Sequence, residues 1–195
     1  MNNIIDDTII INTESLHLDD DDFFSFCQQN PDLRMERDSK KNIVFMSPLG
    51  ALSGNYEINI GKQVAVWNDL LKSGFVFSSN TGFYLDNGAM RSPDVAWIIK
   101  ERWDRLPLEE KEKFPHLCPD FIIELKSKTD SLKQLKNKMN EWMKNGCRLA
   151  FLIIPEEKKA IVYRANGTQT EKTFNEKISG EDVLPGFELD LSELK

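Results

Sequence analysis

The sequence is poor in the side chains that form disulfides or bind zinc. Its 195 residues include three cysteines, Cys27, Cys118 and Cys147, and this odd number with wide spacing argues against a disulfide framework. Two histidines, His17 and His116, are too few for a histidine-rich zinc site. Because cysteines that form no disulfide are typical of reducing compartments, we expect a cytoplasmic protein.

Long apolar runs and nucleotide-binding motifs are also missing. No run approaches the roughly 20 apolar residues of a membrane-spanning helix, and the N-terminus has neither the basic nor the apolar region of a secretory signal. The sequence contains no glycine-rich phosphate-binding loop and no Gly-X-Ser-X-Gly motif, which argues against a serine-hydrolase triad. We therefore expect neither a membrane partner nor an organic cofactor.

Negative charge is concentrated at the N-terminus. The formal net charge is −7, from 32 acidic and 25 basic residues. Residues 1–22 hold seven acids and no lysine or arginine, so residues 23–195 carry 25 acids and 25 bases. We therefore predict an acidic N-terminal segment, 1–22, followed by a single domain, 23–195.

Positive charge is concentrated in the segment 126–148, which holds seven bases against Asp130 and Glu141. Such a segment is compatible with a phosphate-containing substrate. A protein that binds DNA tightly without sequence preference would usually be more basic over its whole length. The charge balance therefore permits a nucleic-acid partner without requiring one.

Hydrophobic periodicity predicts a sheet flanked by helices. Helices are expected at 20–29, 49–73 and 101–114, and from Asp130 to a C-cap at Asn145-Gly146. Strands are expected at 42–47, 75–78, 83–86, 93–99, 119–126 and 149–154, and at 159–164 with 168–174 as a hairpin. This order corresponds to an α/β (α+β) fold with a mixed β-sheet core.

The segment 119–126 is predicted to be a buried strand that ends in charged residues. Because side chains alternate along a strand, Ile122, Glu124 and Lys126 share one face. A buried charge at Glu124 needs compensation by a cation, a carboxylate network or the neighbouring lysine. The alternative is a local ion pair at a strand end, which contributes little stability when exposed.

A second acidic side chain, Asp94, follows Pro93 at the start of another predicted strand. In isolation this dipeptide is more typical of a turn. Neighbouring strands could nevertheless bring Asp94 within a few ångströms of Glu124, and two such carboxylates suit Mg²⁺ or Mn²⁺. A lysine beside them could orient an attacking water and offset charge in the transition state. The combination is that of a metal-dependent phosphodiesterase.

The pattern Pro93-Asp94 … Glu124-Leu125-Lys126 resembles that of the PD-(D/E)XK nuclease superfamily. More narrowly, the chain resembles the Uma-type restriction endonuclease family, which is abundant in cyanobacteria. The matching motifs are Arg34-Met35-Glu36-Arg37, Phe45-Met46-Ser47-Pro48, Arg91-Ser92-Pro93-Asp94, Pro119-Asp120-Phe121-Ile122-Ile123-Glu124, Lys138-Met139, Asn145-Gly146 and Leu184-Pro185-Gly186. The resemblance implies a restriction-endonuclease-like fold and hydrolysis of DNA phosphodiester bonds.

The resemblance also implies roles for individual residues. The side chains of Asp94 and Glu124 and the carbonyl of Leu125 would bind Mg²⁺, with Mn²⁺ as a substitute. Asp94, Glu124 and Lys126 would be catalytic, together with Glu36, which matches a glutamate that the superfamily places near its active site from an N-terminal element.

Two lysines are candidates for the catalytic one. Many relatives lack a lysine at the position of Lys126 and keep one on the next helix, at the position of Lys138. This chain has both. Lys138 is therefore expected to contact a phosphate or to assist catalysis, and a solvated lysine is the alternative.

We expect DNA as the substrate and a homodimer, because nucleases of this superfamily commonly pair to address two strands and two-fold pairing is the commonest oligomer. Two alternatives stay open. One is a catalytically silent module of the same fold that binds DNA or a protein, which the neutral charge of residues 23–195 favours. The other is an RNA-directed hydrolase of the same fold. The intact set of Asp94, Glu124 and Lys126 favours an enzyme.

Overall fold

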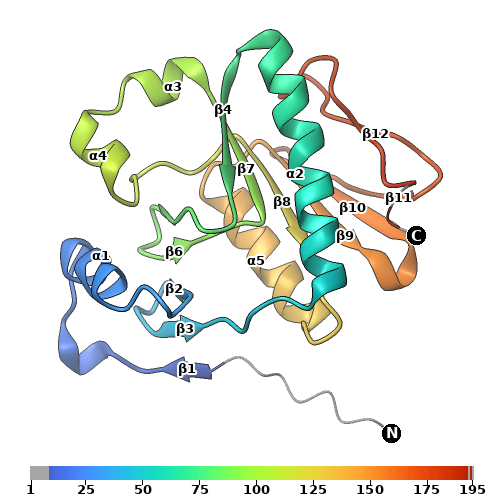
Figure 1. Ribbon diagram of the computed structural model, residues 1–195. Coiled ribbons are helices and arrows are strands. Elements are labelled where there is room, and N and C mark those ends of the chain that lie inside the picture. The colour runs from blue at the N-terminus through green and yellow to red at the C-terminus, as the bar shows by residue number, and fades with distance from the viewer. Residues whose placement is uncertain (1–8, 193, 195) are drawn as a thin grey trace, which may run out of the picture.

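The computed structural model describes residues 9–192 and 194, and its largest element is a six-stranded sheet (Figure 1). The strand order is β11-β10-β9-β8-β7-β4. These strands span Gly74–Ser78 (β4), Val95–Ile99 (β7), Phe121–Leu125 (β8), Leu149–Ile154 (β9), Lys159–Arg164 (β10) and Gln169–Thr173 (β11). β8 and β9 are parallel, and the other neighbours are antiparallel. The predicted mixed sheet is confirmed.

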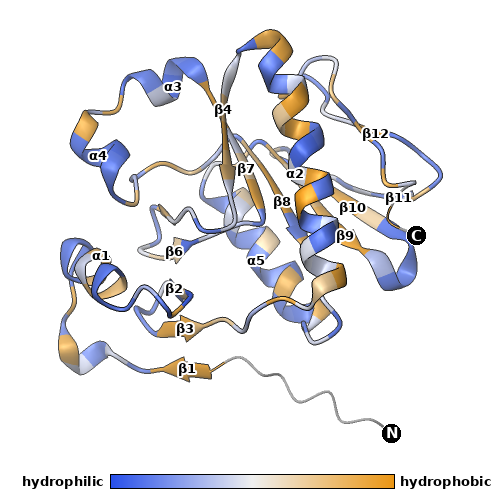
Figure 2. Cartoon of the chain, viewed as in Figure 1, coloured by the Kyte–Doolittle hydropathy of each residue, from blue (hydrophilic) through white to orange (hydrophobic). Residues whose placement is uncertain are grey.

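Helices cover both faces of this sheet. Helix α2 (Ala51–Leu71) packs on one face through Ile60, Val64 and Trp67, and helix α5 (Leu132–Lys144) packs on the other through Met139 and Trp142. Because both faces are covered, the central strands β7, β8 and β9 are hydrophobic along their length, as Figure 2 shows. The one charged side chain within β8 and β9, at Glu124, is therefore an exception that requires an explanation.

A smaller, five-stranded sheet of order β1-β3-β2-β6-β5 lies below the large one in Figure 1. Its strands span Ile9–Ile11 (β1), Met35–Arg37 (β2), Ile43–Phe45 (β3), Phe83–Tyr84 (β5) and Met90–Arg91 (β6). A short 3-10 helix, η1 (Glu14–Leu16), precedes helix α1 (Asp20–Gln29), and Phe23 of α1 packs into a core with Met35 and Tyr84. The chain passes from this sheet into β7 at Ser92 and Pro93, so the two sheets meet beside Asp94.

The acidic residues at 19–22 belong to the start of helix α1. Asp19 and Asp22 form a capping box, and such acids stabilise a helix N-terminus. Asp20 pairs with Arg37, a side chain that is 1% exposed and also donates to the Asp19 carbonyl at 3.2 Å. The predicted boundary after residue 22 thus lies inside α1, and a deletion up to it would remove the partners of a buried guanidinium.

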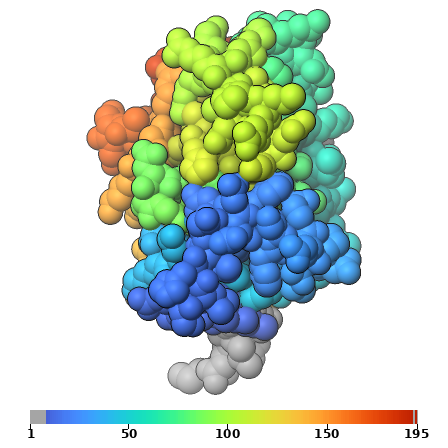
Figure 3. Space-filling view, turned by 90° about the vertical axis from the view of Figure 1, so that its left-hand side faces the viewer, coloured from blue at the N-terminus to red at the C-terminus, as the bar shows by residue number. Residues whose placement is uncertain are grey.

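Helix α1 also contacts the segment that carries the short helices α3 (Lys100–Asp104) and α4 (Leu108–Glu112), and Figure 3 shows the two parts packed against each other. The single helix predicted at 101–114 is in fact two short helices. Pro107 lies between them and is the N-cap of α4. A proline interrupts a helix here because it has no N–H to donate to the preceding turn.

The C-terminal residues close the face that α2 covers. After β9 the chain forms the 3-10 helix η2 (Pro155–Glu157) and then the β10–β11 hairpin. The residues that follow include a two-stranded sheet of β12 (Ile178–Ser179) and β13 (Glu188–Leu189). Trp67 of α2 donates from Nε1 to the carbonyl of Pro185 at 3.0 Å. Among the described residues, no helix combines the length and hydrophobicity that a membrane crossing requires.

Most predicted elements are present with small shifts at their ends. The helix predicted at 49–73 begins at Ala51 and ends before Lys72, which adopts a left-handed conformation. Gly74, which follows the predicted helix, is the first residue of β4. A Cβ there would lie 2.3 Å from the carbonyl oxygen of Ile98, so glycine is required for close strand packing.

Candidate active site

Asp94 and Glu124 occupy facing positions on adjacent antiparallel strands. The β7–β8 ladder pairs Val95 with Ile123, so the next pair outward places Asp94 opposite Glu124. The backbone N–H of Leu125 donates to Oδ2 of Asp94 at 2.6 Å. The strand register thus brings together the two carboxylates that the sequence predicts to share a metal.

Glu124 points toward helix α5, on the face shared with Ile122. The carboxyl group is buried, at 3% exposure for the residue. Its Oε1 lies 2.9 Å from the ammonium of Lys138 and accepts a hydrogen bond of 2.9 Å from the indole N–H of Trp142. Residues 138 and 142 are one helical turn apart, so a single face of α5 supplies both partners.

Glu36 reaches the same place from strand β2 of the smaller sheet. Its Oε1 lies 2.8 Å from the Lys138 ammonium and accepts a bond of 3.0 Å from the backbone N–H of Ser92. Its Oε2 lies 3.0 Å from Arg91, whose Nε donates to Glu141 of α5 at 2.6 Å. Lys138 therefore bridges two buried glutamates that belong to different sheets.

Lys126 lies at the edge of this arrangement. Its ammonium donates to the carbonyl of Ser127 at 2.8 Å and pairs with Glu156 at 3.0 Å. Strand β8 ends at Leu125, so strand alternation no longer fixes the direction of the next side chain. The structure brings Glu36, Asp94, Glu124 and Lys138 together and directs the Lys126 ammonium to η2, while the catalytic role of Lys126 stays a prediction.

The two facing carboxyl groups resist ionisation. Burial, and next the negative charge of Glu124, raise the pKa of Asp94 to about 8. Burial also raises the pKa of Glu124, although Lys138 opposes the shift. Asp94 has no ion-pair partner among the described residues. Without a further cation, the pair is therefore unfavourable in its fully ionised form.

Glu36 and Lys138, in contrast, are stabilised in their charged forms. Burial alone would raise the pKa of Glu36, but the charges of Lys138 and Arg91 outweigh it and lower that pKa. Burial alone would lower the pKa of Lys138, but Glu124 and Glu36 together raise it. Both groups are thus held charged, and Lys138 remains a donor over the physiological pH range.

These residues line a cavity of about 970 Å³. Its walls come from the smaller sheet, the start of α2, the loop 126–131 and the first half of α5. The lining includes Glu36, Arg91, Asp94, Glu124, Leu125, Lys126 and Lys138, with an apolar rim at Ile10, Val44, Phe45, Pro48, Leu49 and Leu52. A cavity of this size holds a small ligand or a short stretch of a polymer.

The charges fit a divalent cation. Four carboxylates, those of Glu36, Asp94, Glu124 and Glu141, surround the cations of Arg91 and Lys138, which leaves two negative charges when all are ionised. Among the described residues, no three or more histidine, cysteine, aspartate and glutamate side chains are grouped so that they could hold a metal ion by themselves. Two carboxylates and a backbone carbonyl, completed by water, suit Mg²⁺, which keeps several of its waters.

Sequence reasoning missed Arg91, Glu141 and Trp142. Arg91 precedes the Ser92-Pro93-Asp94 motif, and its ion pair with Glu36 follows only from the docking of the two sheets. Glu141 and Trp142 could have been found from their spacing of three and four residues after Lys138, which places them on the same helix face.

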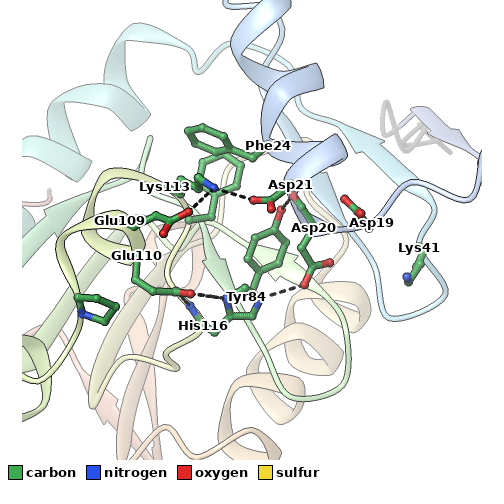
Figure 4. Close-up of a pocket in the computed structure, with 12 residues that line it drawn as sticks. Asp19, Asp20, Asp21, Phe24, Lys41, Tyr84, Glu109, Glu110, Lys113 and His116 are labelled. Atoms are coloured by element: carbon green, nitrogen blue, oxygen red, sulfur yellow. Dashed lines mark hydrogen bonds and ion pairs between the residues drawn. The ribbon is translucent and has the colours of Figure 1, made fainter.

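A second cavity, of about 550 Å³, lies between α1 and the segment that carries α4 (Figure 4). His116 stacks on Tyr84 and contacts Asp20 at 2.9 Å and Glu110 at 3.2 Å. Lys113 contacts Asp21 at 2.9 Å. The ion pairs of Lys113 with Asp21 and of His116 with Asp20 therefore link α1 to the segment that carries α4.

Comparison with known proteins identifies a family for this chain. The family described as "Uma2: Putative restriction endonuclease" matches residues 20–192. The chain belongs to this family. No curated protein matches.

A solved structure gives the Uma2 fold independent support. The crystal structure of a "putative nuclease belonging to DUF820" from Anabaena variabilis is 19% identical, with a TM-score of 0.69. The match covers 82% of this chain and 88% of that one. At this identity the likeness shows the fold, and it confirms the expected nuclease-like α/β architecture.

Proposed function

We propose that this Uma2 protein is a metal-dependent endonuclease that hydrolyses DNA phosphodiester bonds. The observation that carries the proposal is the convergence of Asp94, Glu124, Glu36 and Lys138 in one cavity, from both sheets and helix α5. Paired carboxylates with raised pKa values and an adjacent buried lysine are typical of a catalytic site. The family match supports a nuclease.

Asp94 and Glu124, with the carbonyl of Leu125, would hold Mg²⁺ or Mn²⁺. The ion would supply Lewis-acid chemistry, which screens the phosphate and makes bound water more acidic. The binding of a dication would also relieve the repulsion that raises the pKa values of the two carboxyl groups.

Lys138 is the lysine best placed to act beside the scissile phosphate. Its ammonium lies within 3 Å of both Glu36 and Glu124, and it can donate to an attacking water or to a developing oxyanion. Glu36 holds this ammonium in place, and Arg91 and Ser92 in turn hold Glu36. Lys126, which pairs with Glu156, lines the same cavity and suits a phosphate contact.

Cleavage assays with purified protein test the proposal. Plasmid and linear DNA are incubated with Mg²⁺, with Mn²⁺ and with a chelator. We expect cleavage with either metal and none with the chelator, and Asp94→Asn should reduce the rate by at least about 100-fold. Glu171→Gln, at an exposed acid of the far edge strand β11, is the matched control and should cleave normally.

Three outcomes would overturn the proposal. Cleavage that is unaffected by a chelator would exclude the metal role. Binding of DNA without cleavage under every metal condition would replace the enzyme with a binding module of the same fold, and cleavage of RNA alone would replace the substrate.

A further inference from the structure

Trp142 donates its indole N–H to a candidate metal ligand. The bond to Oε1 of Glu124 is 2.9 Å long, and both residues are buried, with Trp142 at 0% exposure. An indole has one donor and no acceptor, so this bond uses its entire hydrogen-bonding capacity. The contact is therefore specific in direction and involves no water.

The other buried tryptophans with assigned partners use their N–H groups differently. Trp67 donates to the backbone carbonyl of Pro185, and Trp97 donates to the side chain of Asn68. Both partners are neutral groups outside the cavity that Asp94 and Glu124 line. A buried tryptophan needs an acceptor, but only Trp142 takes one from the candidate site.

The bond leaves the two oxygens of Glu124 unequal. Oε1 accepts from Trp142 at 2.9 Å and lies 2.9 Å from Lys138, whereas Oε2 has a longer contact of 3.2 Å with Lys138. A carboxylate has about four lone-pair positions, so Oε2 keeps more capacity for another partner. Two donors from one turn of α5 thus fix the rotation of the carboxylate.

We propose that Trp142 is a positioning residue, which orients Glu124 so that its Oε2, the oxygen with the weaker contact, can bind a divalent cation together with Asp94. This inference rests on the proposed metal-dependent function. Hydrogen bonds to metal-binding carboxylates hold the ligand ready, and their loss typically weakens metal binding by 10- to 100-fold. Trp142 acts through Glu124 and does not touch the ion.

The test compares Trp142→Phe with Trp67→Phe. Each variant keeps a buried aromatic ring and removes one indole N–H bond, but only Trp142→Phe removes it from Glu124. Titration of Mn²⁺ alone into the full chain gives the affinity. We expect roughly tenfold weaker binding for Trp142→Phe and wild-type binding for Trp67→Phe.

A second experiment measures the NMR signal of the Trp142 indole N–H. The chain has four tryptophans and therefore gives four indole N–H signals in a ¹H–¹⁵N correlation spectrum. The signal that disappears in Trp142→Phe belongs to Trp142. We expect Mg²⁺ to shift this signal more than the other three, and Asp94→Asn to abolish the shift.

The outcomes separate the two ideas. If wild type binds Mn²⁺ and Trp142→Phe binds it as tightly as Trp67→Phe does, the positioning role is wrong and the metal site stands. If wild type binds no Mn²⁺, or if Asp94→Asn binds it normally, the proposed metal site fails and the inference fails with it. Should Trp142→Phe fold poorly, benzothienylalanine at position 142 keeps the ring shape without the N–H and decides between the same outcomes.

Discussion

Lys138 and Glu36 are separated by about 100 residues in sequence, yet Nζ and Oε1 lie 2.8 Å apart. Glu36 belongs to the smaller sheet, and Lys138 belongs to a helix that packs on the large sheet. Because the same ammonium lies 2.9 Å from Glu124, one lysine joins the two sheets at the candidate site. Its removal affects both the chemistry and the packing.

Replacement of Lys138 and of Lys126 by methionine should have very different effects on cleavage and on stability. Lys138→Met leaves two buried glutamates without their shared cation, so we expect loss of cleavage and about 3 kcal/mol of lost stability at neutral pH. Lys126→Met breaks a pair with Glu156, which is 46% exposed, and should cost little stability. Denaturant unfolding and cleavage rates check both. Loss of cleavage in Lys126→Met alone would restore Lys126 as the catalytic lysine.

Stability of the metal-free protein should fall as pH rises from about 4 to about 8. The folded-state pKa of Asp94 is about 8, against an ordinary value of 3.8. In this window the folded protein keeps a proton that the unfolded chain releases, so rising pH favours unfolding. Thermal melts at several pH values check the slope, and saturating Mg²⁺ should flatten it. A metal-free melting temperature that rises over this window would contradict the prediction.

Asp94→Asn should stabilise the metal-free protein while it abolishes metal binding. The amide oxygen can still accept from the Leu125 N–H, and the repulsion with Glu124 is gone. We expect a gain of at least about 1 kcal/mol at pH 8, because each unit of pKa shift corresponds to about 1.4 kcal/mol and the pKa of Asp94 is raised from 3.8 to about 8. Urea unfolding without metal measures it. Equal or lower stability would show that the two carboxylates do not repel.

His116 should add a second pH dependence. Burial would lower its pKa, but bonds to Asp20 and Glu110 outweigh this effect and raise the pKa above 6.5. The stabilisation is therefore complete below pH 6.5 and is lost as pH rises through the higher folded-state pKa. His116→Gln should melt lower than wild type at pH 6, and the difference should shrink at pH 8.5. A constant difference would assign the effect to the stacking on Tyr84.

The expected homodimer is tested by light scattering. A chain of 22.5 kDa should give about twice that mass at high micromolar concentration. A monomer mass at that concentration would contradict the expected homodimer. The experiment needs no knowledge of the interface.

The sequence predicts the strands of the site better than its side-chain partners. Alternation within β8 correctly places Glu124 with Ile122, because a strand fixes side-chain direction with period two. Lys126 lies one residue past the strand end, where this rule stops, and its ammonium is directed to Glu156. Helical periodicity predicts the helix that carries Trp142, but periodicity alone does not reveal the acceptor that its N–H uses.

The contacts that the sequence did not predict come from the packing of segments that are far apart in the chain. Glu36, Arg91 and Glu141 meet only because two sheets and a helix pack together, and no local pattern encodes their distances. The resemblance to a nuclease superfamily made Glu36 a candidate site residue. Arg91 was identified as part of the site only from its ion pair with Glu36 in the structure.

The position of α5 in the chain also has a consequence during protein synthesis. A ribosome makes Glu36, Asp94 and Glu124 first, and the turn of α5 that holds the glutamates comes last, near residue 142. Until that turn emerges and docks, Glu124 lacks the indole donor and both glutamates lack their shared ammonium. A chain that ends before the turn 138–142 therefore lacks both the indole donor and the shared ammonium, so such a fragment keeps Glu36 and Glu124 without the partners that hold them in the candidate site.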